Sequence, residues 1–268
     1  MAHESSTKFL TLVTHDYLPG LITLAYSLSV NGGSQITSLT IIHDGEISRE
    51  IRSQVRSFGL NCEYIDSTVL ESVSSPTRQK QPRLDFAFKK LALLKYPHEG
   101  KICFLDADML CLNPLNGVED LEHLSAAPDR GVKEPRMIAG FPMFNTGFLV
   151  YHPSEELFEA VTQYALTTDR PIHTLADQSV LNWYFYEHAP DAVHLLSHDW
   201  NTLKRVYHHA PQHFDLRKIK LLHYVGPKPW DGEAHDQGEE TYHELRKLWW
   251  SYFSDAGGEE LFPAVEAP

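Results

Sequence analysis

The chain has 268 residues, of which 42% are hydrophobic and 22% charged, a composition typical of a globular protein. We therefore expect a single domain over residues 1–268, without long disordered tails. The formal net charge of −13 argues against a general nucleic-acid binder, because binding to a phosphate backbone needs clustered Lys and Arg.

The first apolar run and the cysteines indicate in which cellular compartment the protein is expected. Lys8 to Thr14 is too short for a signal peptide or a membrane span. Cys62, Cys103 and Cys111 have neither zinc spacing nor a disulfide pattern, so we expect reduced thiols in the core. These features predict a cytoplasmic protein that does not insert into a membrane.

The first third of the chain alternates strands and helices. Ser48 is the expected cap of the second helix, and each helix carries apolar residues on one face. Repeated strand-then-helix units predict an α/β fold with a Rossmann-like, mostly parallel central sheet flanked by helices. The expected elements are strands at 8–14, 38–43 and 61–65, and helices at 20–30 and 48–58.

The rest of the chain has a mixed pattern that ends in an amphipathic helix at 241–253. This C-terminal helix is expected to dock on the domain, although it could instead cover a site or mediate a homodimer. The other expected elements are a polar loop at 66–81, helices at 84–96, 154–166 and 177–187, and strands at 101–105, 144–151 and 218–225.

Two carboxylates follow the buried strand at 101–105. Asp106 and Asp108 are separated by one residue, and ligands of open α/β sheets collect at the carboxyl ends of strands. Oxygen ligands suit Mg²⁺ or Mn²⁺, which can bridge a diphosphate and neutralise its charge as it leaves. Taken alone, such a pair is more often a loop cap or a solvated group.

A second polar group begins at the end of the last predicted strand. His223 could complete a metal site made by the two carboxylates, and Lys228 could then meet a phosphate as a point charge. The alternative is a hydrogen-bonded histidine and a surface lysine in a stiff loop that contains two prolines.

Two further groups offer hydrogen bonds to a sugar. Asn145 and Thr146 stand beside a glycine at the start of a strand, where they could bind sugar hydroxyls or simply form a turn. Asp177 and Gln178 begin a predicted helix, where Asp177 either caps the helix or contacts a donor sugar, with Gln178 near the anomeric carbon.

Taken in order, these segments resemble glycosyltransferase family 8, the glycogenin-like family. The resemblance spans residues 9 to about 230 and rests on the whole ordered set. The segments that carry it are Phe9–Asp16, Lys90-Leu91, Phe104–Leu110, Leu124–Asp129, Phe144–Gly147, Asp177-Gln178 with Leu181-Asn182, and His223–Gly226 with Lys228–Trp230.

The resemblance implies a GT-A fold, a Mn²⁺ (or Mg²⁺) cofactor and a UDP-sugar donor, with UDP-glucose or UDP-galactose preferred. About 8–115 would form the nucleotide-sugar-binding half, about 116–235 the acceptor half, and 236–268 the C-terminal helix and tail. The implied metal ligands are Asp106, Asp108 and His223. The implied catalytic residues are Asp177, Gln178 and Lys90, with Asp129 on the acceptor side. The implied nucleotide-sugar contacts are Leu12, Thr14, His15, Tyr17, Arg83, Lys90, Asp106, Ala107, Asn145, Thr146, Asp177, Gln178, Gly226 and Lys228.

Three departures weaken a specific glycogenin assignment more than they weaken the family. His15 stands where such members often have Asn, Thr174 stands where the glycogenin branch usually has an acid, and one residue fewer separates Gly226 from Lys228. Two alternatives stay open: a self-glucosylating primer with Tyr207 as acceptor, and a non-catalytic nucleotide-sugar-binding protein.

The family resemblance also predicts retention of anomeric configuration. In the preferred mechanism the acceptor hydroxyl attacks from the face that UDP leaves. A double displacement would need a carboxylate beneath the sugar, and Asp177 is the nearest candidate. The acceptor itself is not predicted beyond a hydroxyl on a sugar, a polyol or another small molecule.

Overall fold

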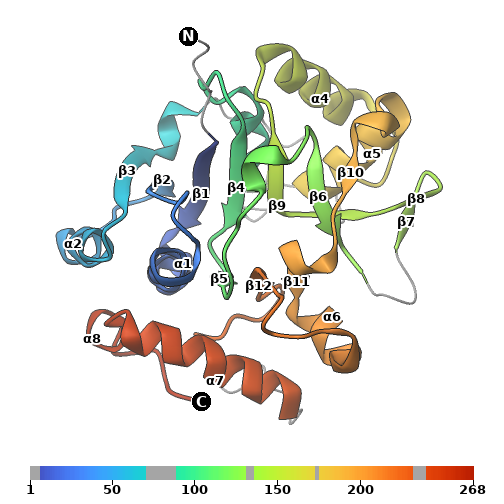
Figure 1. The fold of residues 1–268 in the computed structure, drawn as a ribbon. Helices are drawn as coiled ribbons and strands as arrows, with labels where there is room; N and C mark the ends of the chain where they lie inside the picture. The colour runs from blue at the N-terminus through green and yellow to red at the C-terminus, as the bar shows by residue number, and fades with distance from the viewer. Residues whose placement is uncertain (1–6, 71–88, 131–135, 173–174, 232–239) are drawn as a thin grey trace.

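The computed structural model describes residues 7–70, 89–130, 136–172, 175–231 and 240–268 (Figure 1). Its strands are β1 (Lys8–Thr14), β2 (Ser38–Asp44), β3 (Asn61–Asp66), β4 (Ile102–Asp106), β5 (Met109–Cys111), β6 (Ser125–Pro128), β7 (Met137–Ile138), β8 (Phe141–Pro142), β9 (Phe144–Tyr151), β10 (His194–Leu195), β11 (Thr202–Leu203) and β12 (Leu221–His223). Its helices are α1 (Leu18–Asn31), α2 (Arg49–Ser57), α4 (Glu155–Thr167), α5 (Asp177–His188), α6 (Lys204–His209), α7 (Glu240–Asp255) and α8 (Gly258–Leu261).

Seven strands form the central sheet in the order β10-β6-β9-β4-β1-β2-β3. β1 pairs in parallel with β2 and β4, whereas β9 is antiparallel to both β4 and β6. The predicted mostly parallel sheet flanked by helices is thus confirmed. Because β9 runs against its neighbours, its first residues lie at the same edge of the sheet as the last residues of β4.

Both faces of the central strands are buried, which explains their continuous apolar sequences. On β4, Phe104 contributes to one core cluster with residues of α4 and α5, and Cys103 and Leu105 contribute to another with residues of α1 and α2. The expected capping of α2 is confirmed, since the Ser48 hydroxyl accepts a hydrogen bond from the Ile51 amide. These contacts hold the carboxyl ends of β1 and β4 rigidly beside each other.

The prediction for the last strand was partly wrong. The segment expected at 218–225 is a strand only over Leu221–His223, and it joins β5 and β11 in a separate three-stranded sheet. Lys218 and Lys220 stand before it, and Gly226 after it adopts φ +77°, so the extended conformation is short. The predicted helix at 84–96 begins outside the described residues, and Ala92–Lys95 is a 3₁₀ turn.

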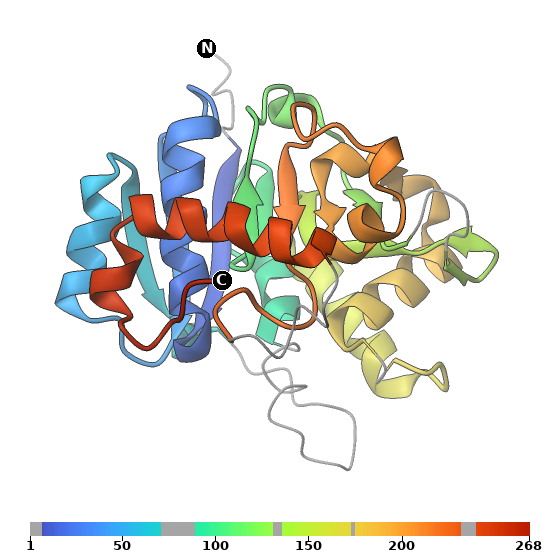
Figure 2. The same cartoon turned by 90° about the horizontal axis from the view of Figure 1, so that it is seen from below.

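α7 docks on the domain, as expected of the C-terminal helix. Figure 2 shows it crossing α1, which it contacts. Leu245, Trp249 and Phe253 are buried on its inner face, whereas Tyr242 and Tyr252 are half-buried. A role in a homodimer stays a prediction.

The predicted state of the cysteines agrees with the structure, in which all three thiols are free. Cys103 and Cys111 are buried and Cys62 is half-buried. Among the described helices, none combines the length and the apolar character needed to cross a bilayer.

Candidate active site

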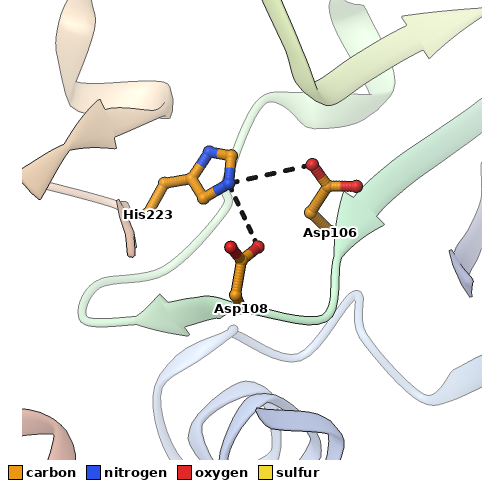
Figure 3. A group of neighbouring side chains, drawn as sticks. All are labelled: Asp106, Asp108 and His223. Carbon is orange, nitrogen blue, oxygen red and sulfur yellow. Dashed lines mark ion pairs between the residues drawn. The ribbon is translucent and has the colours of Figure 1, made fainter. Parts of the chain in front are cut away.

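Asp106 and Asp108, at the turn between β4 and β5, converge with His223, which lies more than 100 residues later in the chain (Figure 3). His223 Nε2 lies 3.1 Å from Asp108 Oδ1 and 3.7 Å from Asp106 Oδ2. One ligand atom from each residue can be chosen so that all three lie within 4.8 Å of one another. This is the spacing at which three ligands can share one ion.

Strand pairing brings His223 to the carboxylates. Asp106 is the last residue of β4, and Asp108 immediately precedes β5. β12 is antiparallel to β5, so that His223 lies opposite Met109, and the Tyr224 amide donates to the Asp108 carbonyl at 3.0 Å. The register of a three-residue strand therefore decides which side chain completes the group.

Gly147 on β9 leaves room for the imidazole. A Cβ atom at this position would lie 2.3 Å from His223 Cε1 and 2.7 Å from Nδ1, closer than non-bonded atoms approach. His223 Nδ1 is 3.1 Å from Oδ1 of Asn201. The ring is thus held between a glycine on its flank and an amide behind it.

The donor atoms fit a divalent cation. When Nδ1–H donates to Asn201, Nε2 presents a lone pair to Asp108 Oδ1. Two electron-pair donors separated by 3.1 Å repel each other unless a proton or a cation lies between them. Two carboxylates and an imidazole suit Mn²⁺ or Mg²⁺, with an outer hydrogen bond orienting the histidine.

Two lysines flank the carboxylates. Lys90 Nζ lies 3.0 Å from Asp106 Oδ1 and 3.5 Å from Asp177 Oδ2. Burial alone would lower the pKa of Lys90, but the two carboxylates raise it overall. Lys228 pairs with Asp108 Oδ2 and donates to the Tyr224 carbonyl at 3.1 Å. Both ammonium groups stay charged at the edge of the site.

The pKa of the Asp108 carboxyl is lowered despite its burial. Burial opposes its charge, but the charge of Lys228, together with that of His223 when its ring is protonated, outweighs that effect. Burial raises the pKa of Asp177, because the opposing charge of Lys90 does not compensate for it. The site therefore holds two buried carboxylates whose affinities for a proton are shifted in opposite directions.

Asp177 does not cap its helix. The N-cap of α5 is Ala176, at φ +46°, with no side-chain hydrogen bond from the cap. The Asp177 carboxylate instead accepts a hydrogen bond from Thr146 Oγ1 at 2.8 Å. The alternative of a simple helix cap was wrong, because the start of α5 is turned toward β9 and Lys90.

Asp129, the residue expected on the acceptor side, is 1% exposed. Its Oδ1 accepts hydrogen bonds from Gln178 Nε2 at 3.0 Å and from Arg205 Nη2 at 2.9 Å. Asn145 Nδ2 donates to Gln178 Oε1 at 2.9 Å. The polar residues expected at the sugar therefore form one buried network, and the acceptor role of Asp129 stays a prediction.

The residues expected around the nucleotide extend from the end of β1. Leu12 pairs with Asp106 in the sheet, and the Tyr17 ring centroid lies 5.2 Å from Lys228 Nζ. A Cβ at Gly20 would lie 2.4 Å from the Ala107 carbonyl, so α1 begins against the turn that carries the carboxylates. Thr14 is half-buried and His15 exposed, while Arg83 and Thr174 lie outside the described residues.

Two polar residues of the site were missed by sequence reasoning. Asn201 precedes β11 and contacts His223, and Arg205 on α6 contacts Asp129. Neither belongs to a recognisable pattern. Only the pairing of β11 with β12 brings this segment to the site. Tyr207, the alternative acceptor tyrosine, is half-buried, and its ring centroid lies 6.0 Å from that of Phe214.

The profile of Glycosyl transferase family 8 matches residues 9–234. This chain belongs to that family. It is 30% identical over 249 residues to glycogenin of Neurospora crassa, covering 90% of this chain and 34% of the relative, and 29% identical over 266 residues to glycogenin-1 of Homo sapiens, covering 92% and 71%. It is also 27% identical over 215 residues to the putative UDP-glucuronate:xylan alpha-glucuronosyltransferase 4 of Arabidopsis thaliana, covering 80% and 34%. The chain thus spans about a third of the length of the first and third relatives.

Solved structures agree on the fold. The galactosyltransferase LgtC, in complex with donor and acceptor sugar analogues, superimposes with a TM-score of 0.67 at 19% identity, covering 93% of this chain and 96% of that one. GlyE of Streptococcus pneumoniae superimposes with a TM-score of 0.64 at 20% identity, covering 98% and 66%. The predicted family, GT-A fold and enzyme class, a hexosyltransferase, are confirmed.

Proposed function

We propose that this family 8 enzyme is a metal-dependent, retaining transferase that passes a hexose from a UDP-sugar to an acceptor hydroxyl. The observation that supports it best is the convergence of Asp106, Asp108 and His223 between two lysines, Lys90 and Lys228. A diphosphate brings negative charge that must be balanced where it leaves, and these groups offer a cation site with an ammonium group on either side.

Asp106, Asp108 and His223 would hold Mn²⁺ or Mg²⁺. The ion, when bound, neutralises charge that builds on the diphosphate as a leaving group. Lys228 would make a charge-assisted contact to the same phosphates, close to Gly226, whose φ of +77° turns the backbone there. Its present partner, Asp108, would then be balanced by the ion.

The other residues are assigned to the two ends of the donor, the sugar and the nucleoside, and to the acceptor. Lys90 and Asp177 form an ion pair beside Asp106, on the side where the sugar would lie. The donor would occupy the half at about 8–115, and the acceptor the half at about 116–235. The proposed nucleoside contacts are Leu12, Thr14, His15, Tyr17, Arg83 and Ala107, and the proposed sugar contacts are Lys90, Asn145, Thr146, Asp177 and Gln178, with Asp129 on the acceptor side.

Retention would come from attack on the face that UDP leaves. Positive charge develops at the anomeric carbon, and a buried carboxylate at Asp177 would stabilise it electrostatically. Asp177 Oδ2 already accepts a hydrogen bond from Thr146 and lies 3.5 Å from Lys90. These contacts reduce its strength as a nucleophile, which favours the front-face route over a covalent intermediate.

The proposal of a uridine diphosphate donor has support from one relative whose name contains UDP-glucuronate. We prefer UDP-glucose or UDP-galactose because the resemblance to the glycogenin-like family implies these donors, and the glycogenins match over more of this chain than the glucuronosyltransferase does. A panel of UDP-sugars, screened by thermal shift and then by UDP release, would identify the sugar.

Metal dependence gives the direct test. UDP release from the preferred donor should require Mn²⁺ or Mg²⁺, stop with EDTA and return when the ion is added in excess. Asp108→Asn removes one charged ligand and should lower the rate at a fixed Mn²⁺ concentration by at least tenfold, because metal charge stabilises the leaving group by several kcal/mol. Glu244→Gln, an exposed change on α7, serves as the control. Full activity of Asp108→Asn in EDTA would refute the proposal.

A further inference from the structure

A single line of hydrogen bonds runs from β9 to the imidazole of His223. The Gly147 amide donates to Asn145 Oδ1 at 2.9 Å, and Asn201 Nδ2 donates to the same oxygen at 2.8 Å. Asn201 Oδ1 then faces His223 Nδ1 at 3.1 Å. Asn145 is 5% exposed and Asn201 is fully buried, so solvent does not compete for these bonds.

The direction of every bond in this line follows from its first member. A backbone N–H can only donate, so the Asn145 atom that meets Gly147 must be the carbonyl oxygen. The Asn201 atom that faces this oxygen must then be its NH₂ group, which leaves Oδ1 for the histidine. An amide oxygen can only accept, and His223 Nδ1 must therefore carry a proton.

The hydrogen bond made by the NH₂ group of Asn145 prevents the amide from flipping. Nδ2 donates to Gln178 Oε1 at 2.9 Å, and Gln178 Nε2 in turn donates to Asp129 Oδ1 at 3.0 Å. The Thr146 amide also points at Gln178 Oε1, at 3.4 Å. A carboxylate at one end and backbone amides along the line thus impose one orientation on both asparagine side chains and on Gln178.

We propose that Asn201, oriented by Asn145, is a positioning residue that holds His223 with Nδ1 protonated, so that Nε2 offers its lone pair to the cation. The inference rests on the proposed metal site. It explains why a buried amide is needed: without it, Nε2–H would donate to Asp108 Oδ1, 3.1 Å away. That proton would occupy the position of the ion. The lone pair of the ring would then be on Nδ1, which points away from the carboxylates.

Two variants of Asn201 test whether its side chain acts through the oxygen that accepts from His223 or only through its volume. Asn201→Leu keeps the volume and removes the acceptor, so the affinity for Mn²⁺ should fall by about 10- to 100-fold, as is usual when the outer partner of a ligating histidine is lost. Asn201→Asp keeps an oxygen for Nδ1–H but loses the NH₂ group that donates to Asn145 Oδ1, so it should recover much of the Mn²⁺ affinity that Asn201→Leu loses. Free Mn²⁺, measured by electron paramagnetic resonance without any sugar nucleotide, gives both values.

The control replaces a different asparagine, Asn113, whose side-chain amide donates hydrogen bonds to backbone carbonyls outside the site. Asn113 Nδ2 donates to the carbonyls of Leu216 and Ile219, in the segment that leads into β12. Asn113→Leu should leave the Mn²⁺ affinity within about twofold of the wild type, because the change alters no bond of the line. Thermal unfolding of each variant confirms that the binding data refer to folded protein.

Nitrogen-15 spectra of metal-free protein with labelled histidine provide the second readout. The His223 signals are identified as those missing from His223→Gln. In the wild type the neutral ring should carry its proton on Nδ1, whereas in Asn201→Leu the proton should move toward Nε2. A wild-type His223 whose neutral ring carries its proton on Nε2, or an Asn201→Leu variant with unchanged Mn²⁺ affinity, would overturn the inference.

The same experiments distinguish this inference from the function on which it rests. If the wild type binds Mn²⁺ no better than His223→Gln does, the metal site is wrong, and the proposed role of Asn201 toward an ion is overturned with it. If the wild type binds Mn²⁺ through His223 and Asn201→Leu does so equally well, the metal site stands and only the positioning role is lost.

Discussion

Lys228 and Asp177 lie on opposite sides of the paired carboxylates. Lys228 contacts Asp108 directly, whereas Asp177 reaches Asp106 through the ammonium group of Lys90. This arrangement matches their proposed places, one at the diphosphate and one at the sugar. The two side chains should therefore affect different steps of the reaction.

Lys228→Ala should weaken UDP as well as the UDP-sugar. The loss of one charge-assisted contact to phosphate costs about 1.5–3 kcal/mol, which is roughly 10- to 150-fold in Kd. Calorimetric titration of UDP at saturating Mn²⁺ measures the change without turnover. Saturation matters, because removing the ammonium group also changes how tightly Asp108 holds the ion. An unchanged Kd would place Lys228 away from the phosphates.

Asp177→Asn should leave the Kd of UDP within about twofold and lower kcat by about 100-fold or more, because the lost charge acts on a group whose own charge changes in the transition state. The variant keeps the acceptor oxygen for Thr146, so the fold of this region should survive. If Asp177→Asn loses UDP affinity as severely as Lys228→Ala, Asp177 is a structural member of the Lys90 ion pair and its catalytic role must be withdrawn.

At the scale of elements, the site depends on how closely β9 and β12 approach. Gly147→Ala would place its Cβ 2.3 Å from His223 Cε1, so the ring should be displaced from its position beside the carboxylates. We expect at least a tenfold loss of Mn²⁺ affinity, on the scale at which disturbed outer contacts lower metal binding.

A double-mutant cycle identifies the cause of that loss. In a His223→Ala background there is no ring to displace, so Gly147→Ala should have little further effect on Mn²⁺ affinity. Equal losses in both backgrounds would mean that the methyl group disturbs β9 or Asn145, whose Oδ1 lies 2.9 Å from the same position, and does not act through the histidine.

α7 packs against the segment that carries Lys228, the residue proposed to contact the phosphates. Trp249 is fully buried and packs on Trp230, at 5.4 Å between ring centroids, and Arg246 Nε donates to the Pro229 carbonyl at 3.1 Å. The segment that carries Lys228 is therefore held in place by α7. Through these contacts, the amphipathic C-terminal helix takes an indirect part in the proposed site.

Trp249→Ala should destabilise the protein by about 3–5 kcal/mol, the usual cost of truncating a buried aromatic residue. Urea unfolding measures the free energy, and UDP titration at a temperature where the variant stays folded should show weaker binding. The half-buried neighbour Trp250 provides the matched control, since Trp250→Ala should have a smaller effect on stability. A loss of stability with unchanged UDP affinity would separate α7 from the site.

At the scale of the whole molecule, the prediction concerns stereochemistry. In the proposed binding mode, one side of the donor sugar would face Asp177 and the buried hydrogen-bond network behind it. An acceptor that arrives from the open side should give an α-linked product from an α-linked donor. The anomeric proton coupling of the isolated product measures this. A β linkage would exclude the front-face route.

Much of this architecture could be predicted from local pattern. Apolar runs predict the strands at Lys8–Thr14 and Phe144–Tyr151, and capping predicts the start of the second helix at Ser48; both signals depend on neighbouring residues. Asp106 and Asp108 could be found for the same reason, because a run of apolar residues defines the strand that they follow.

The tertiary structure alone decided which side chains meet. Asn201 has no sequence signal, and its contact with His223 arises from the pairing of β11 with β12. Asp129 is a conspicuous acid in the sequence, yet in the structure it is buried beneath Gln178 and Arg205. Local periodicity determines where strands and helices form, whereas the direction of a buried amide depends on groups tens of residues away, which become neighbours only when the sheets assemble.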